Sequence, residues 1–245
     1  MNKIVILIAT ACIFAYGVAV GNYQIFPFTY IAATKIFVAD NLNRKQLPNV
    51  VQPSVETDDV YEFVFLGNSL THHSPNFDIG WNKNHGMAAS NLEKDFVHQF
   101  MSLINNDSAY IANMYPIERD ISDLDSVISR VRPAFENAGV VVIQLGDNTN
   151  EAHEEELEAL KISIDELGKL IKPNQLLLCV STYWRNRVKD RIIEESCENN
   201  SGQYVFIGDI FDYQTSEDLP FFTHAGVNMH PKDPQMLLIA KRIRA

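Results

Sequence analysis

The sequence predicts an α/β fold, in which helices cover both faces of a five-stranded parallel sheet. Strand-like and helix-like segments alternate five times between residues 61 and 244. The third strand-like segment, at 139–145, is almost uninterruptedly apolar, as is typical of a strand buried on both faces. A parallel sheet with right-handed crossovers accommodates this alternation, so we expect a three-layer α/β/α sandwich.

The strands are predicted from short apolar runs that end in polar or glycine-containing loops. They lie at 61–66, 110–115, 139–145, 175–180 and 204–210. Five such strands fit a flavodoxin-like order, 2-1-3-4-5, whose switch point lies between the first and third strands. The loops at 67–71 and 146–150 should therefore flank the same crevice.

The helices are predicted from apolar residues that recur at helical spacing. In the first of them, Leu92, Phe96 and Phe100 lie on one face. The expected helices span 88–104, 122–137, 151–171, 186–197 and 234–244. Asp233 is the expected N-cap of the last helix, because Pro234 then falls in its first turn.

The composition is that of a globular protein rather than a disordered one, with 46% hydrophobic and 21% charged residues in 245. The formal net charge is −11, and the Lys and Arg residues do not cluster. Nucleic acid is therefore not an expected partner, because phosphate binding needs a basic patch.

The N-terminal segment predicts export and membrane attachment. No charged residue occurs between Lys3 and Lys35, and an apolar run from 4 to 21 continues into aromatic residues up to 31. We expect residues 1–3 to be a cytoplasmic stub and 4–31 a signal-anchor transmembrane helix with an aromatic juxtamembrane segment. The alternative is a cleaved signal peptide and a secreted protein, with small residues at 17–21 as the cleavage site.

The rest of the chain divides into a linker and one domain. Residues 32–59 are largely polar in their second half, contain two prolines and show no periodicity, so they are the expected linker. Residues 60–245 form the expected domain. It would lie in the periplasm or extracellular space, held at the inner (cytoplasmic) membrane by a single-pass helix with its N-terminus inside.

The cysteine and histidine spacings do not predict a metal site or a cofactor. There is no CxxC motif, and the histidines other than His230 are scattered. Cys179 falls in a predicted strand and Cys197 near a helix end. A disulfide between them and two buried thiols are both compatible with the sequence of an exported domain.

Four residues on the predicted active edge of the sheet are candidates for chemistry. Ser69 follows the first strand in the turn Gly-Asn-Ser-Leu, and Asn148 follows the third in Gly-Asp-Asn-Thr. Gly86 lies in the loop after Ser69, where its N–H would be unobstructed. His230 precedes the last helix at the same edge and is a candidate general base. Trp81 and Trp184 fall in loops at this edge, where they would stack on a sugar or pack in the core.

These four blocks, in this order, resemble those of the SGNH hydrolases, also called the GDSL esterase/lipase family. The resemblance covers about residues 60–245, and details around Ser69 and Gly86 look like a branch of uncharacterised exported bacterial members. It implies that Ser69 is the nucleophile and His230 its base. It also implies an oxyanion hole formed by the N–H groups of Ser69 and Gly86 and the amide of Asn148, with no cofactor.

The sequence departs from the family pattern at three positions. Asn68 replaces the Asp of the Gly-Asp-Ser turn, and Thr149 replaces the second acid of the third block. The acid expected three residues before the histidine is Val227, which cannot orient the imidazole. The candidates for that task are a backbone carbonyl or one of four side chains: Asn228, His224, Asp209 and Asp233.

The resulting hypothesis is a membrane-anchored exported serine esterase that removes a small acyl group, such as acetyl, from an ester. By analogy with exported relatives, the ester would be carried by a carbohydrate. An O-acyltransferase acting on a polysaccharide is the second hypothesis. The third is a catalytically weak glycan-binding module, which the valine at position 227 favours.

Overall fold

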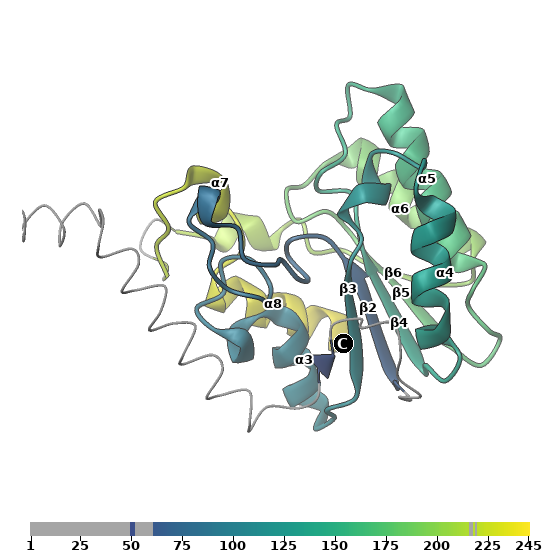
Figure 1. Ribbon diagram of the computed structural model, residues 1–245, viewed down its shortest axis with the longest axis horizontal. Coiled ribbons are helices and arrows are strands. Elements are labelled where there is room, and N and C mark those ends of the chain that lie inside the picture. Colours follow the sequence, from purple (N-terminus) through teal and green to yellow (C-terminus); the bar gives the residue numbers. More distant parts are fainter. Residues whose placement is uncertain (1–49, 52–60, 216–217, 219) are drawn as a thin grey trace, which may run out of the picture. The chain divides into compact units, whose positions relative to one another are not determined.

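The structure, a computed structural model, describes residues 50–51, 61–215, 218 and 220–245. Within these residues the chain forms a parallel sheet of six strands in the order β1-β3-β2-β4-β5-β6 (Figure 1). The strands are β1 (Val50–Val51), β2 (Phe63–Gly67), β3 (Ala109–Asn113), β4 (Val140–Gln144), β5 (Leu176–Val180) and β6 (Gln203–Val205). The five strands β2 to β6 have the predicted order 2-1-3-4-5, so the predicted α/β fold is confirmed.

Helices lie on both faces of this sheet, with α3 and α8 on one side and α4, α5 and α6 on the other (Figure 1). The α-helices are α3 (Phe96–Ile104), α4 (Leu124–Phe135), α5 (Glu154–Gly168), α6 (Arg187–Asn199), α7 (Ala225–Asn228) and α8 (Asp233–Arg244). Short 3-10 helices are η1 (Phe77–Ile79), η2 (Leu92–Lys94), η3 (Tyr115–Glu118) and η4 (Ile210–Tyr213).

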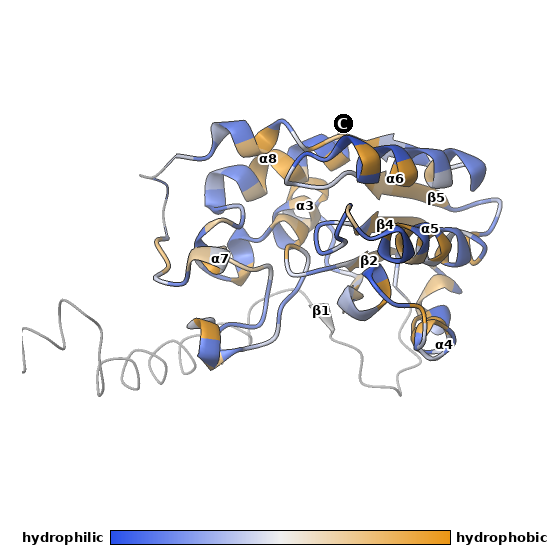
Figure 2. Ribbon diagram, turned by 90° about the horizontal axis from the view of Figure 1, so that it is seen from above, coloured by the Kyte–Doolittle hydropathy of each residue, from blue (hydrophilic) through white to orange (hydrophobic). Residues whose placement is uncertain are grey.

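The side chains of β2 show how the sheet holds the layers together. Phe63 and Phe65 pack with α3 and α8, whereas Val64 and Leu66 pack with the helices of the opposite face. In Figure 2 the strands are apolar and the helices turn hydrophilic residues outward. Since β2 is buried on both faces and lies between β3 and β4, its carboxyl end is held firmly at the switch point.

Several predicted boundaries differ from the structure; the fifth strand, expected at 204–210, spans only Gln203–Val205, and a 3-10 helix begins at Ile210. The first helix begins at Phe96 rather than near residue 88, because Asp95 accepts a hydrogen bond from His98 N and caps it there. Asp233 does not cap α8: its carboxylate accepts hydrogen bonds from Ser90 N and Oγ, and Lys232 is the cap residue. The short strand β1 lies within the segment predicted to be a linker.

The predicted transmembrane helix at 4–31 lies outside the described residues. Within the part of the chain that the structure describes, no helix has the length and apolarity needed to cross a bilayer.

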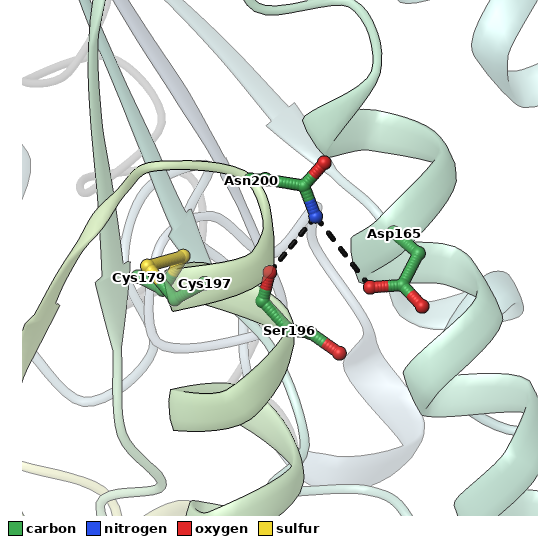
Figure 3. Close-up of a disulfide and its surroundings, with 5 residues drawn as sticks. All are labelled: Asp165, Cys179, Ser196, Cys197 and Asn200. Atoms are coloured by element: carbon green, nitrogen blue, oxygen red, sulfur yellow. Dashed lines mark hydrogen bonds between the residues drawn. A yellow bond between two sulfur atoms is a disulfide. The ribbon is translucent and has the colours of Figure 1, made fainter.

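Cys179 of β5 and Cys197 of α6 form a disulfide (Figure 3). Next to it, Asn200 Nδ2 donates to Ser196 O at 2.8 Å and to Asp165 Oδ1 of α5 at 3.5 Å. The disulfide therefore lies where β5, α6 and α5 meet, and it links β5 covalently to the helix that follows it.

Removing this disulfide should lower the free energy of unfolding without moving the sheet edge that carries Ser69. The two cysteines are 18 residues apart, and closing a loop of that length stabilises a folded protein by about 3 kcal/mol. We expect the double variant Cys179→Ala/Cys197→Ala to lose about that amount in urea denaturation. Wild-type protein denatured with a reductant should match the variant, and equal stability with and without reductant would contradict this prediction.

Candidate active site

The switch point of the sheet brings together loops from distant parts of the chain. Ser69 follows β2, Asn148 follows β4, and His230 lies between α7 and α8. These three side chains line one cavity of about 280 Å³. The remaining lining residues are His73, Ile79, Met87, Asn113, Tyr115, His224, Gly226 and Val227.

Ser69 and His230 are hydrogen-bonded to each other. Ser69 Oγ lies 2.8 Å from His230 Nε2, and His230 Nδ1 lies 2.7 Å from the carbonyl oxygen of Gly226. A carbonyl only accepts hydrogen bonds, so Nδ1 must carry the proton of the neutral ring. Nε2 is then the unprotonated nitrogen and can accept the proton of the Ser69 hydroxyl.

The backbone carbonyl of Gly226 therefore orients the imidazole, and none of the four candidate side chains does. The Asn228 side chain accepts from Phe222 N and Lys232 Nζ. His224 caps α7. Asp209 forms an ion pair with Arg242, and Asp233 binds Ser90.

Val227 occupies the position of the expected acid because that position belongs to an apolar cluster. The Val227 side chain is buried and packs with Trp81, Met87 and Ala88. A carboxylate there would have to be desolvated among these apolar groups, which is unfavourable unless the carboxylate is paired. Trp81 is fully buried in this cluster, so it packs in the core and is not free to stack on a sugar.

The environment of His230 favours its neutral form. Burial lowers the pKa of His230 to about 4, against the opposing effect of the hydrogen bond to Gly226. Trp184 contributes to this burial with an edge-to-face contact at 5.0 Å between ring centroids. The imidazole is thus available as a base over the whole neutral pH range.

Two of the three predicted oxyanion donors remain available at the cavity. The Ser69 N–H makes no hydrogen bond to any described residue. Asn148 Nδ2 donates one of its two N–H bonds to Glu118 Oε2 at 2.5 Å, which leaves the second free to act on a substrate. The Gly86 N–H, by contrast, donates to Asp95 Oδ2 at 3.2 Å. The hydrogen of Gly86 N is therefore directed at Asp95 and is not available to an oxyanion in this structure.

Gly86 is nevertheless required by close packing. A Cβ atom there would lie 2.5 Å from the Leu70 carbonyl oxygen and 2.8 Å from Asp95 Cβ. The loop after Ser69 therefore passes directly over the nucleophile turn. Met87 N also donates to Ser69 O at 2.7 Å, which fixes the main chain of the serine.

Glu118 is a site residue that the sequence analysis missed. It ends η3, directly after β3, and its side chain is fully buried. Its Oε1 accepts from Asn68 Nδ2 at 3.0 Å and from Gly146 N at 2.6 Å, while Oε2 accepts from Asn148. The order 2-1-3 places the loop after the second strand beside the crevice as well, so an acid in that loop was the available signal.

The network around Glu118 explains the two other departures from the family pattern. Burial raises the pKa of Asp147 to about 6, and Asn68, which donates to Glu118, partly opposes this effect through a hydrogen bond to Asp147. An Asp at position 68 would place a third carboxyl beside these two. Thr149 donates its hydroxyl to the Glu118 carbonyl at 2.8 Å, which a carboxylate could not do.

Among the described residues, no three or more His, Cys, Asp and Glu side chains are grouped so that they could hold a metal ion.

Replacing Asn68 by Asp should destabilise the fold in a pH-dependent way. The variant loses the donor to Glu118 and adds a negative charge to a desolvated pair of carboxyls, so we expect a loss of about 3–5 kcal/mol. The loss should be larger at pH 8 than at pH 5, because protonation relieves the repulsion. Urea denaturation at both pH values tests this, with Asn199→Asp, which adds a charge at an exposed position near the end of α6, as the control. Equal losses at the two pH values would contradict the prediction.

Comparison with known proteins gives matches of structure only: no protein-family model and no curated protein matches this sequence. A two-domain esterase (CEX) active on acetylated mannans aligns at 14% identity with a TM-score of 0.43, over 76% of this chain and 48% of that one. The same esterase co-crystallised with mannopentaose aligns at 15% identity and 0.47, with the same coverage.

A structure of TesA aligns at 10% identity and 0.44, over 74% of this chain and 96% of TesA. The chain thus spans about half the length of the two-domain esterase. These identities and TM-scores are low. The five strands β2 to β6 nevertheless have the order predicted from the alternation of strands and helices.

Proposed function

We propose that this chain is a serine ester hydrolase that acts through a Ser69–His230 dyad. The observation that carries the proposal is the hydrogen bond of 2.8 Å between Ser69 Oγ and His230 Nε2, with the opposite ring nitrogen held by Gly226 O. A nucleophile, a base in the correct tautomer and a group that orients the base are the parts that acyl transfer to a serine requires.

The proposed reaction proceeds in two steps. Ser69 Oγ attacks the ester carbonyl while His230 Nε2 takes its proton, and the imidazolium then returns a proton to the leaving alcohol. Water attacks the acyl-enzyme in the same way and releases the acid. The Ser69 N–H and the free N–H of Asn148 stabilise the negative charge on the carbonyl oxygen in both steps.

The proposed substrate is a small acyl ester, such as an acetyl ester, carried by a carbohydrate. A cavity of about 280 Å³ accommodates a short acyl chain, and Ile79, Met87 and Val227 provide apolar lining. Tyr115 also lines the cavity and is 46% exposed, so its ring offers a face for a sugar.

Two alternatives use the same site. An acyltransferase would pass the acyl group from Ser69 to a glycan hydroxyl instead of to water, and it would show turnover only when an acceptor glycan is present. The second alternative, a catalytically weak glycan-binding module, is favoured by the valine at position 227. The Gly226 carbonyl supplies the missing contact to His230, which favours an enzyme over that module.

We further propose that the domain is exported and held at the cytoplasmic membrane by residues 4–31. The Cys179–Cys197 disulfide supports export, because structural disulfides form and persist in oxidising compartments.

Replacing Ser69 or His230 by alanine should abolish hydrolysis of 4-nitrophenyl acetate by the domain as it occurs in the full chain. Loss of the nucleophile or of its base removes the acylation step, so we expect kcat/KM to fall by at least about 10³-fold in each variant. The double variant should be no slower than either single one. Turnover unaffected by Ser69→Ala would overturn the esterase proposal.

The membrane proposal predicts that the mature protein retains its N-terminus. N-terminal sequencing of protein isolated from the membrane fraction should find no cleavage near residues 17–21. A mature chain beginning at Val20 or Asn22 would show that the segment is a cleaved signal peptide.

A further inference from the structure

Glu118 binds two loops of the proposed site without lining its cavity. The carboxylate accepts from Asn68, which precedes the nucleophile, from Gly146, which begins the loop after β4, and from Asn148 in that loop. All three partners are donors, and all three bonds go to the same fully buried carboxyl group. The arrangement is suited to the ionised form, which only accepts hydrogen bonds.

The bond from Asn148 matters most, because it determines which atom of the Asn148 amide faces the cavity. As long as Glu118 Oε2 is an acceptor, Nδ2 must point toward it. If Glu118 Oε2 carried a proton, it would become a donor, and the Asn148 amide would rotate so that its oxygen faced Oε2. The N–H groups of Asn148 would then lie elsewhere, and the substrate carbonyl would lose this hydrogen-bond donor.

We propose that Glu118 is a positioning residue that holds the Asn148 amide as an oxyanion donor, and that protonation of Glu118 switches this donor off. The inference rests on the proposed function of Ser69 and deepens it, since it assigns a pH-dependent control to the same site. Glu118 does not contact the substrate, so its effect is transmitted through Asn148.

The surroundings of Glu118 allow this switch near neutral pH. Burial raises the pKa of Glu118 to about 7; hydrogen bonds from Asn68 and Asn148 oppose this effect, and the charge of Asp147 adds to it. Lys189 acts on Asp147 and also donates to Thr149 O. From α5, Glu156 pairs with Arg119, so it is engaged elsewhere.

The sign of the effect follows from which form is active. Above pH 7 Glu118 is ionised and Asn148 is held as a donor, so activity is high. As the pH falls through about 7, Glu118 gains a proton and activity falls. His230 does not account for this decline, because its pKa of about 4 keeps the imidazole neutral there.

The test compares Glu118→Gln, Asn148→Ala and the double variant with the wild type on 4-nitrophenyl acetate, in the full chain. Glutamine keeps the shape of Glu118 but presents an NH₂ group to one of its donors. We expect kcat to fall about 10²-fold in each single variant, with KM changed less than about twofold. Because both changes remove the same donor, the double variant should be no slower than Asn148→Ala.

The pH profile separates positioning from a structural role. Wild-type activity should fall below about pH 7, whereas Glu118→Gln and Asn148→Ala should both lack that decline. Asp190→Asn is the matched control: Asp190 is a buried carboxylate that accepts from Thr182 N and Oγ1, outside the proposed site. The Asp190→Asn variant should have a lower melting temperature but should retain the decline in activity near pH 7.

Several outcomes would overturn the proposal. The proposal is overturned if Glu118→Gln keeps the wild-type kcat, or if the losses in kcat multiply in the double variant. It is also overturned if the decline in activity near pH 7 persists in Asn148→Ala. If Glu118→Gln does not fold, the wild-type and Asn148→Ala profiles decide alone. Ser69→Ala is assayed in parallel: turnover that survives it overturns the esterase itself, whereas an inactive Ser69→Ala beside an unaffected Glu118→Gln overturns only the role of Glu118.

Discussion

The hydrogen bond from His230 Nδ1 to the Gly226 carbonyl is the interaction on which the proposed chemistry depends. It fixes the tautomer that leaves Nε2 as an acceptor for the Ser69 hydroxyl. A neutral carbonyl stabilises an imidazolium less than a carboxylate does, so the bond to Gly226 only partly opposes the burial that lowers the pKa of His230 to about 4. The dyad should therefore remove the serine proton more slowly than a complete triad does. Its imidazole, however, is neutral at every pH near 7.

The missing acid is part of a wider change in polarity around the site. Val227 joins an apolar cluster under the cavity, and the buried carboxyl of Glu118 and the partly buried carboxyl of Asp147 lie instead behind the nucleophile turn. There they orient main-chain and amide N–H groups rather than the imidazole. Asn68 donates to Glu118 and acts on Asp147, so one amide replaces an acid where a third carboxyl would be repelled.

The fold and the position of Ser69 at the crevice were predictable because both follow from patterns that are local in sequence. Alternating segments give the sheet order, and the order places Ser69, Asn148 and His230 at one edge. The topology placed the loop of Glu118 beside the crevice, but the role that we propose for Glu118 was not predictable, because it depends on bonds to residues 28, 30 and 50 positions away. Likewise, only the structure shows that a main-chain carbonyl orients His230 and that Asp95 accepts a hydrogen bond from the Gly86 N–H.

The most direct test of the central claim is covalent labelling of the nucleophile with a fluorophosphonate, followed by mass spectrometry of the digested protein. The account predicts one adduct per chain, on Ser69, and much slower labelling in His230→Ala because the base is gone. An adduct on another serine, or turnover of 4-nitrophenyl acetate that continues in protein with fully labelled Ser69, would contradict it.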